Sequence, residues 1–345
     1  MLRRALAALI LAAAAHCAPA QARADAAGAT IGPAQLAVIV NDADPASVVV
    51  GARYAARRGV PSANVIHVRF EPGRPVMQRE AFIALHRSVE ARLPPGIQAY
   101  ALTWTAPYRV DCMSITTAFA AGFDPAWCAS GCHATRRSPY FNTSGHRPFE
   151  QYGLRPAMIV AAGSVEGAIG LVERGYLADG TRPAGTGYLV QTTDKARSVR
   201  AALYAEVKRI LGPFVRLRIM QTDLLADRHD VLFYFTGAVT VAGLQSIGFR
   251  PGAIADHLTS TGGRLTDSRQ MSALRWIDAG ATGTYGTVVE PCNLLEKFPH
   301  PGVVIGRYLS GDTLVEAYWK SVAMPGQGVF VGEPLAAPYR PRGGS

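Results

Sequence analysis

The chain is 345 residues long, and its 35 lysines and arginines exceed its 25 acidic residues to give a formal net charge of +10. The basic residues are scattered in pairs such as Arg57-Arg58 and never form a run of five, which argues against a nucleic-acid-binding arm. After the N-terminus no apolar stretch approaches the length of a transmembrane helix, so we expect no membrane span in the mature protein. A basic surface still favours an anionic partner, such as an envelope polysaccharide or a lipid headgroup.

The first 24 residues have the three parts of a secretory signal peptide. Arg3 and Arg4 are followed by an apolar stretch over residues 5–15 and then by small residues up to Ala24. This stretch is too short to span a bilayer as a helix, which makes a membrane anchor the weaker alternative. We expect cleavage after Ala24, or else after Ala20, and a periplasmic or secreted mature protein.

Four cysteines remain after this cleavage, namely Cys112, Cys128, Cys132 and Cys292. An even number in an exported chain indicates disulfides, for which three pairings are possible. The first three lie close together in a stretch with little predicted regular structure, so we expect at least one disulfide there. A zinc site that combines these cysteines with nearby histidines fits an oxidising compartment less well. We therefore expect no metal and no cofactor.

Short apolar runs alternate with helical segments from residue 36 onward. Strands are predicted at residues 36–40, 64–70 and 99–104, with helices at 44–59 and 77–93 between them. The first helix begins with Asp44 as N-cap and Pro45 in its first turn, and Gly59 ends it. Residues 106–155 interrupt the pattern with three cysteines and several Gly and Pro. We interpret them as a loop-rich insertion over the carboxyl edge of the sheet.

The alternation returns after residue 156. Strands are predicted at residues 157–162, 187–192, 215–220, 231–235, 282–289 and 329–331. Helices are predicted up to Gly175, at 195–211, at 268–279, and from a capping box of Thr313 and Glu316 to Val322. This order predicts an α/β protein with three αβα layers, a mostly parallel central sheet, and a single domain over residues 25–345.

Several longer strings of residues are specific enough to indicate a family. They lie at residues 108–116, 231–237, 251–260, 280–293, 316–322 and 331–335. Together they resemble an uncharacterised family of exported bacterial proteins from genomes that carry exosortase, a membrane transpeptidase proposed to sort proteins with a C-terminal Pro-Glu-Pro signal. The similarity covers about residues 36–339. It implies an envelope protein whose partners belong to exopolysaccharide or protein-sorting machinery, and it implies no established reaction.

The last third of the chain is also similar to caspase- and gingipain-type peptidase domains. The strings Gly-Ala-Thr-Gly-Thr-Tyr-Gly at 280–286 and Gly-Asp-Thr-Leu-Val-Glu-Ala at 311–317 resemble a strand and the start of a helix that follow the catalytic cysteine in those domains. This resemblance implies a caspase-like core, with a Rossmann-like core as the alternative. Those peptidases carry a His-Gly pair at the end of a central strand, where this chain has Thr236-Gly237. Either the general base lies elsewhere or the chain is a non-peptidase relative.

A thiol nucleophile is the sharpest enzymatic hypothesis. Cys292 follows a predicted strand, and His257 with Asp256 precedes a flexible loop rich in Thr and Gly. A catalytic cysteine needs a nearby imidazole to lower the pKa of its thiol and to protonate the leaving group. Cys292, His257 and Asp256 are therefore the candidate catalytic residues of a cysteine hydrolase or peptidase, unless Cys292 is buried or disulfide-bonded.

Six polar residues are expected to line a cleft, because they are predicted at strand ends or in the loops just after them. They are Arg109, Asp111, Ser114, Glu290, Asn293 and Lys297. Trp104, Trp127 and Tyr108 offer aromatic faces for a sugar or peptide unless they belong to the core. The alternative to a thiol hydrolase is thus a non-catalytic envelope protein that binds a peptide or glycan, or that serves as a scaffold.

Overall fold

The structure is a computed structural model that describes residues 30–129 and 131–341. The predicted signal peptide and both predicted cleavage sites lie outside the described residues. Within the described residues, no helix is long and apolar enough to cross a membrane.

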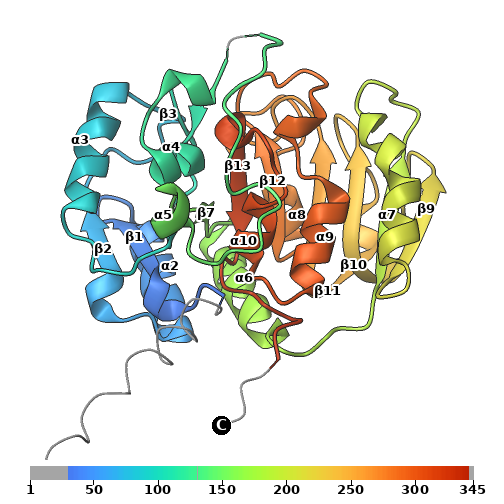
Figure 1. Cartoon of the computed structure of the whole chain (residues 1–345), viewed down its shortest axis with the longest axis horizontal. Coiled ribbons are helices and arrows are strands. Elements are labelled where there is room, and N and C mark those ends of the chain that lie inside the picture. The colour runs from blue at the N-terminus through green and yellow to red at the C-terminus, as the bar shows by residue number, and fades with distance from the viewer. Residues whose placement is uncertain (1–29, 130, 342–345) are drawn as a thin grey trace, which may run out of the picture.

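In the described part of the chain, ten strands form a central sheet in the order β2-β1-β4-β7-β13-β12-β11-β10-β8-β9 (Figure 1). In chain order these strands are β1 (Leu36–Asn41), β2 (Val65–Val68), β4 (Ala99–Leu102), β7 (Ala157–Ile159), β8 (Thr186–Gln191), β9 (Arg216–Gln221), β10 (Arg228–Gly237), β11 (Ile247–Leu258), β12 (Gly283–Thr287) and β13 (Gly328–Gly332). β1 runs parallel to β2 and β4, and β10 runs parallel to β8 and β11. β12 and β13 pair antiparallel. The predicted mostly parallel sheet is confirmed.

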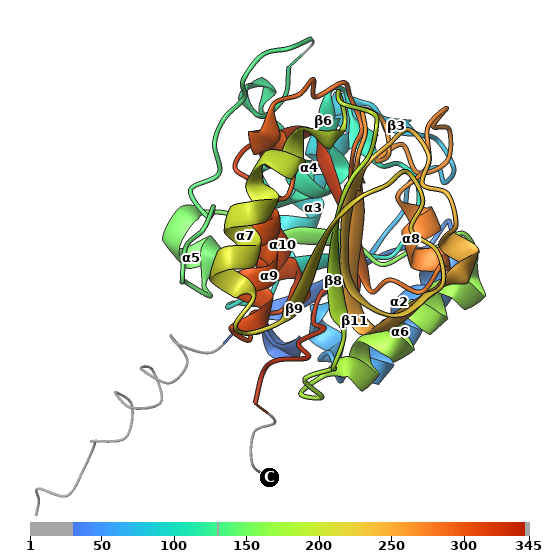
Figure 2. The same cartoon turned by 90° about the vertical axis from the view of Figure 1, so that its right-hand side faces the viewer.

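Helices cover both faces of this sheet. They are α2 (Pro45–Arg58), α3 (Arg79–Glu90), α4 (Ile115–Ala121), α5 (Pro148–Tyr152), α6 (Val165–Ala178), α7 (Tyr204–Leu211), α8 (Leu274–Asp278), α9 (Pro301–Leu309) and α10 (Leu314–Trp319). Figure 2 shows α7, α9 and α10 on one side of the sheet and α2, α6 and α8 on the other. The three αβα layers predicted from the sequence are therefore present.

Local sequence signals set the ends of several helices. The Asp44 carboxylate accepts a hydrogen bond of 3.0 Å from the Ala46 N–H, and Gly59 ends α2 with φ of 64°. A glycine adopts this left-handed conformation without the steric cost that other residues have. At the start of α10, the Glu316 carboxylate accepts hydrogen bonds from the backbone N–H and the hydroxyl of Thr313. The predicted N-cap and capping box are both confirmed.

Two predicted helices differ from the structure, and two of its elements were not predicted. The helix expected at 195–211 is a 3-10 helix, Ser198–Leu203, followed by α7, and the helix expected at 268–279 is reduced to the short α8. The twelve-residue strand β11 and the helix α9 were not predicted. Asp256 and His257 lie inside β11, so the apolar pattern that predicts a buried strand is broken at these two positions.

The insertion over residues 106–155 is more ordered than expected. It contains α4, α5 and the strands β5 (Arg109–Val110) and β6 (Met113–Ser114), which form a small sheet with β3 (Val76–Met77). Two threonines of α4 attach it to the segment around β13. The hydroxyl of Thr116 donates to the Gly328 carbonyl, and that of Thr117 donates to the Pro325 carbonyl. The insertion therefore packs against the segment around β13 in the central sheet and is not a free loop over the edge of the sheet.

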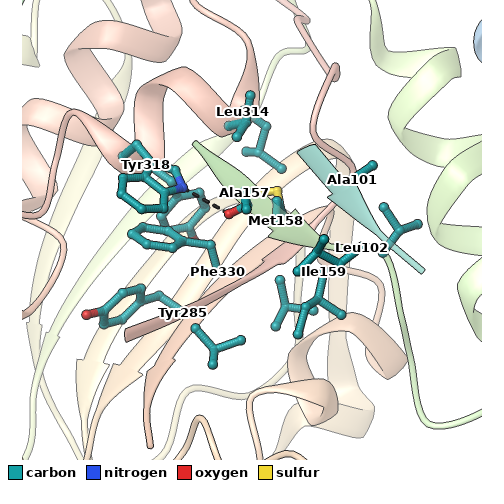
Figure 3. Close-up of a cluster of buried hydrophobic side chains, with 14 of the residues drawn as sticks. Ala101, Leu102, Ala157, Met158, Ile159, Tyr285, Leu314, Tyr318 and Phe330 are labelled. Atoms are coloured by element: carbon teal, nitrogen blue, oxygen red, sulfur yellow. Dashed lines mark hydrogen bonds between the residues drawn. The ribbon is translucent and has the colours of Figure 1, made fainter. Parts of the chain in front are cut away.

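The side chains of α10 pack tightly on the middle of the sheet (Figure 3). The ring of Trp319 stacks on that of Phe330 with 4.7 Å between centroids, and its indole N–H donates to the Ala157 carbonyl at 2.9 Å. Tyr285 meets Phe330 edge to face with centroids 5.1 Å apart. Trp104, Trp127 and Tyr108 are also buried, at 1 %, 3 % and 1 % exposure. These rings form the core and offer no exposed face to a sugar.

Candidate functional site

The cysteines are paired in the structure, and this corrects the catalytic role expected of Cys292. Cys112 is bonded to Cys128, and Cys132 is bonded to Cys292. The disulfide expected within the cysteine-rich stretch is the Cys112–Cys128 bond, whereas Cys132 pairs outside that stretch. A disulfide sulfur is not a thiolate, so Cys292 cannot act as a nucleophile. The same pairing leaves no thiolate in this region to bind zinc.

His257 is a core residue rather than a general base. It is 2 % exposed, its Nδ1 accepts a hydrogen bond of 2.9 Å from the Trp276 indole, and its Nε2 lies 3.2 Å from the Met271 carbonyl. The first contact requires an unprotonated Nδ1, and the second requires a protonated Nε2, which together describe a neutral ring. Burial, reinforced by the Arg200 charge, lowers the pKa of His257 to about 3. Both ring nitrogens are therefore occupied, and none is left to move a substrate proton.

Asp256 does not orient His257. Neighbouring residues of a strand point to opposite faces of the sheet, so the two side chains of β11 diverge. The Asp256 carboxylate instead forms an ion pair of 2.5 Å with Arg200, and both side chains are 2 % exposed. Arg200 also donates to the Thr236 carbonyl at the end of β10. Burial raises the pKa of Asp256 and outweighs the lowering effect of Arg200. The expected triad of Cys292, His257 and Asp256 is thus replaced by a disulfide, a core imidazole and a buried ion pair.

The six residues expected to line one cleft are separated in the structure. Arg109 and Asp111 line a small pocket of about 420 Å³, where Asp111 forms an ion pair of 2.7 Å with Arg79. Ser114 is buried and caps α4 by accepting a hydrogen bond from the Thr117 N–H.

The other three of these residues lie around the disulfide that follows β12. Glu290 and Asn293 are exposed, and the Glu290 carboxylate accepts a hydrogen bond of 2.8 Å from the Cys292 N–H. Lys297 is buried, and burial lowers the pKa of its ammonium group. None of the six residues lines the groove of about 1190 Å³ described next. Across residues 30–129 and 131–341, no three His, Cys, Asp or Glu side chains are arranged to hold a metal ion.

A groove of about 1190 Å³ lies between α7 and α9, and we call it the α7–α9 groove. Figure 1 shows these two helices side by side on one face of the sheet. Its apolar lining includes Leu203, Val207, Ile210, Leu211, Phe214 and Val303. Ile210 is 49 % exposed and Phe214 is 75 % exposed, although both are large apolar side chains. Exposed apolar side chains that gather in a concave site are typical of a ligand-binding surface.

Glycines on α9 leave room in this groove. Gly302 and Gly306 are one helical turn apart, and both line it. A Cβ atom added at Gly306 would meet nothing nearer than a Leu211 methyl group at 3.7 Å. α7 lines the groove on the other side, and Phe214, which follows the Gly212-Pro213 turn after α7, also lines it. A Cβ atom added at Gly302 would lie 3.1 Å from a Val207 methyl group, so Gly302 lets the two helices approach closely, whereas Gly306 leaves space.

Arginines gather at one end of the groove, around the start of β8. Thr186, in β8, pairs in register with Arg216 of β9, and a Cβ atom added at Gly185 would lie 3.4 Å from the Arg250 side chain. Arg182 lines the groove from the loop just before Gly185. These three arginines are exposed, and no ion pair in the described part of the chain involves them.

The groove was not predicted from the sequence. Its walls come from residues 203–216 and 300–310, which are far apart along the chain. One local signal was present, because Phe214 follows Gly212-Pro213 directly and is not needed for the apolar pattern of the next strand. Comparisons of the chain with protein-family models, with curated proteins and with solved structures find no match.

Proposed function

We propose that the chain is an exported binding protein of the cell envelope, which holds its ligand in the α7–α9 groove and catalyses no reaction. The observation that carries this proposal is the groove itself, which is large, has the exposed apolar side chains of Ile210 and Phe214 in its lining, and is bordered by arginines that form no ion pair within the described residues. Small-molecule sites typically measure about 300–1,000 Å³, and this groove, at about 1190 Å³, is somewhat larger than that.

Two further observations support a binding role over a thiol enzyme. The cysteine proposed as nucleophile is bonded to Cys132, and the histidine proposed as base is a neutral core residue with both ring nitrogens occupied. The likeness to caspase-type domains then concerns the core rather than the reaction. We accordingly propose that the chain is a non-peptidase relative of that fold.

The disulfides and the N-terminal sequence support the proposed compartment. Two disulfides in the described chain are compatible with an oxidising environment, and the arrangement of the first 24 residues is that of a secretory signal peptide. The resemblance of residues 36–339 to the exosortase-associated family agrees with a periplasmic or secreted location. It also supports a partner in exopolysaccharide or protein sorting.

Dye binding to a blocked groove tests the binding role. N-phenyl-1-naphthylamine is neutral and fluoresces strongly only in apolar surroundings, so we expect its emission to rise with the wild-type protein. A Gly306→Phe variant fills the groove and is expected to lower the affinity for the dye at least tenfold. The matched control is Gly170→Phe on α6, where an added Cβ would also meet only a side-chain atom at 3.7 Å. Equal dye binding by the wild type and Gly306→Phe would overturn the proposal.

The Cys132→Ser/Cys292→Ser double variant tests the absence of thiol chemistry. Binding of the dye is expected to persist in this variant, since neither cysteine lines the groove. A thiol-reactive probe is expected to label none of Cys112, Cys128, Cys132 and Cys292 in the native wild-type protein, because these four cysteines are paired. Labelling of Cys292 in the folded wild type would contradict the assignment.

A further inference from the structure

We infer that the ligand of the α7–α9 groove is an anionic amphiphile, with one hydrocarbon chain that ends in a phosphate or a carboxylate. This inference rests on the proposed function, and it adds the chemical class of the ligand. Two features of the groove support this inference. Its helical walls offer apolar surface but no free backbone groups that could pair with a bound peptide, and a cluster of arginines lies at one end.

The walls of the groove suit a hydrocarbon chain better than an extended peptide. Val207, Ile210 and Leu211 of α7 and Val303 of α9 line it, and Phe214 extends the apolar surface beyond the end of α7. The backbone N–H and C=O groups inside a helix are bonded to one another. A peptide strand laid between two helices would therefore leave its own backbone groups without partners, which is unfavourable once water is removed. A hydrocarbon chain has no such groups to satisfy.

The arginines at the start of β8 supply the charge that an anionic headgroup needs. Arg182, Arg216 and Arg250 line the groove from three different segments and form no ion pair within the described residues. A guanidinium group can donate two parallel hydrogen bonds to a phosphate or carboxylate, which makes arginine well suited to such anions. Three of them at one end fix the orientation of the ligand.

The other charged groups of the groove are already engaged with protein partners. Arg307 donates two hydrogen bonds to Asn142, and Glu206 accepts both of its hydrogen bonds from Arg209. Asp230 is the carboxylate nearest the arginine cluster. It accepts hydrogen bonds from the Thr186 hydroxyl at 2.6 Å and the Tyr188 hydroxyl at 2.9 Å.

Asp230 therefore reduces the positive charge near Arg216 without forming an ion pair with it, and the cluster keeps an excess of positive charge. Because this charge lies at one end of an apolar groove, a uniformly charged polymer would match only that end. An amphiphile matches both parts.

Calorimetric titration of the mature chain tests this inference. The probes are dodecyl phosphate, dodecanoate, neutral dodecyl maltoside and inorganic phosphate, each below its micelle concentration where it has one. We expect both alkyl anions to bind at least tenfold more tightly than dodecyl maltoside, and inorganic phosphate to bind at least a hundredfold more weakly than dodecyl phosphate. Shortening the chain by two methylene groups is expected to weaken binding roughly tenfold. The ratio between dodecyl phosphate and dodecanoate shows which headgroup the arginines prefer.

Variants separate the contributions of the headgroup and the chain. Replacing Arg182, Arg216 and Arg250 together with glutamine is expected to weaken alkyl-anion binding at least thirtyfold and to leave dodecyl maltoside binding unchanged. Arg218→Gln is the matched control, since Arg218 is exposed two residues further along β9 and does not line the groove. The Gly306→Phe substitution is expected to weaken the binding of every chain-bearing probe.

The outcomes distinguish this inference from the proposed function. The inference is overturned if the alkyl anions bind no better than dodecyl maltoside, or if the triple glutamine variant binds them as tightly as the wild type. It is also overturned if an acidic peptide displaces N-phenyl-1-naphthylamine and the alkyl anions do not. In each of these cases the proposed function stands as long as Gly306→Phe abolishes dye binding. If Gly306→Phe changes neither dye nor amphiphile binding, both proposals fail.

Discussion

Replacing both cysteines of the Cys132–Cys292 disulfide with serine is expected to destabilise the protein more than replacing both cysteines of the Cys112–Cys128 disulfide. The first bond closes a loop with a sequence separation of 160 residues, and the second closes one of 16 residues. A disulfide stabilises a protein mainly by restricting its unfolded chain, and the restriction grows with the logarithm of the loop length. This dependence gives about 5 kcal/mol for the longer loop and about 3 kcal/mol for the shorter one.

The difference of about 2 kcal/mol is the sharper expectation, because the constant part of the loop-closure entropy cancels between the two variants. Urea unfolding of the wild type and of both double-serine variants, followed by circular dichroism, measures it. Double replacement avoids leaving an unpaired thiol, which would add its own chemistry. The reasoning would be refuted if the Cys112→Ser/Cys128→Ser variant unfolded at the lower urea concentration, with equal dependence of the unfolding free energy on urea in both variants.

Four other substitutions test the core and the helix beside the groove. The pKa of His257 is lowered from about 6.5, its value in the unfolded chain, to about 3 in the folded protein. The contribution of the neutral ring to the unfolding free energy is therefore present above pH 6.5 and is lost progressively as the pH decreases below 6.5. Between pH 6.5 and 4.5 the wild type is expected to lose about 2.3 kcal/mol more than His257→Asn, and equal loss in thermal unfolding would contradict this.

Asp256→Asn leaves the buried Arg200 charge unpaired and is expected to cost about 3–5 kcal/mol in urea unfolding, whereas exchanging both residues for apolar ones is expected to cost less. A cost of the single change no larger than that of the double change would oppose this account. Gly306→Ala is expected to raise the unfolding free energy by about 0.5–1 kcal/mol, because its Cβ fits inside α9. Gly237→Ala is expected to lower it, since its Cβ would lie 1.9 Å from the Arg197 carbonyl oxygen, and the reverse order of stability would refute the reasoning.

Much of the fold was predictable because its signals are local. The alternation of apolar runs and helical segments predicts the α/β class, since each element must bury one apolar face. The N-cap at Asp44 and the capping box of Thr313 and Glu316 were predictable for the same reason, because both interactions join residues within one helical turn. The expected single domain over residues 25–345 and the family resemblance remain predictions.

The missed strand β11 shows where local patterns fail. Asp256 and His257 make its sequence look like a polar loop, yet both are buried in the structure. Their partners are Arg200, from an earlier segment, and Trp276, from a later one. A buried polar side chain is tolerated only when such partners exist, and no residue near β11 in the sequence indicates that Arg200 and Trp276 are these partners. The catalytic interpretation of these two residues was wrong for the same reason.

The amino-acid sequence by itself determined the α/β class and several helix ends, since each depends on residues close together in the chain. Only the tertiary structure decided the cysteine pairing, which joins positions 132 and 292, and so removed the proposed nucleophile. It also brought α7 beside α9 and gathered Arg182, Arg216 and Arg250 at one end of the groove between them. Such a site is made by contacts between distant segments, and their packing is fixed by the burial of the whole core rather than by any local pattern.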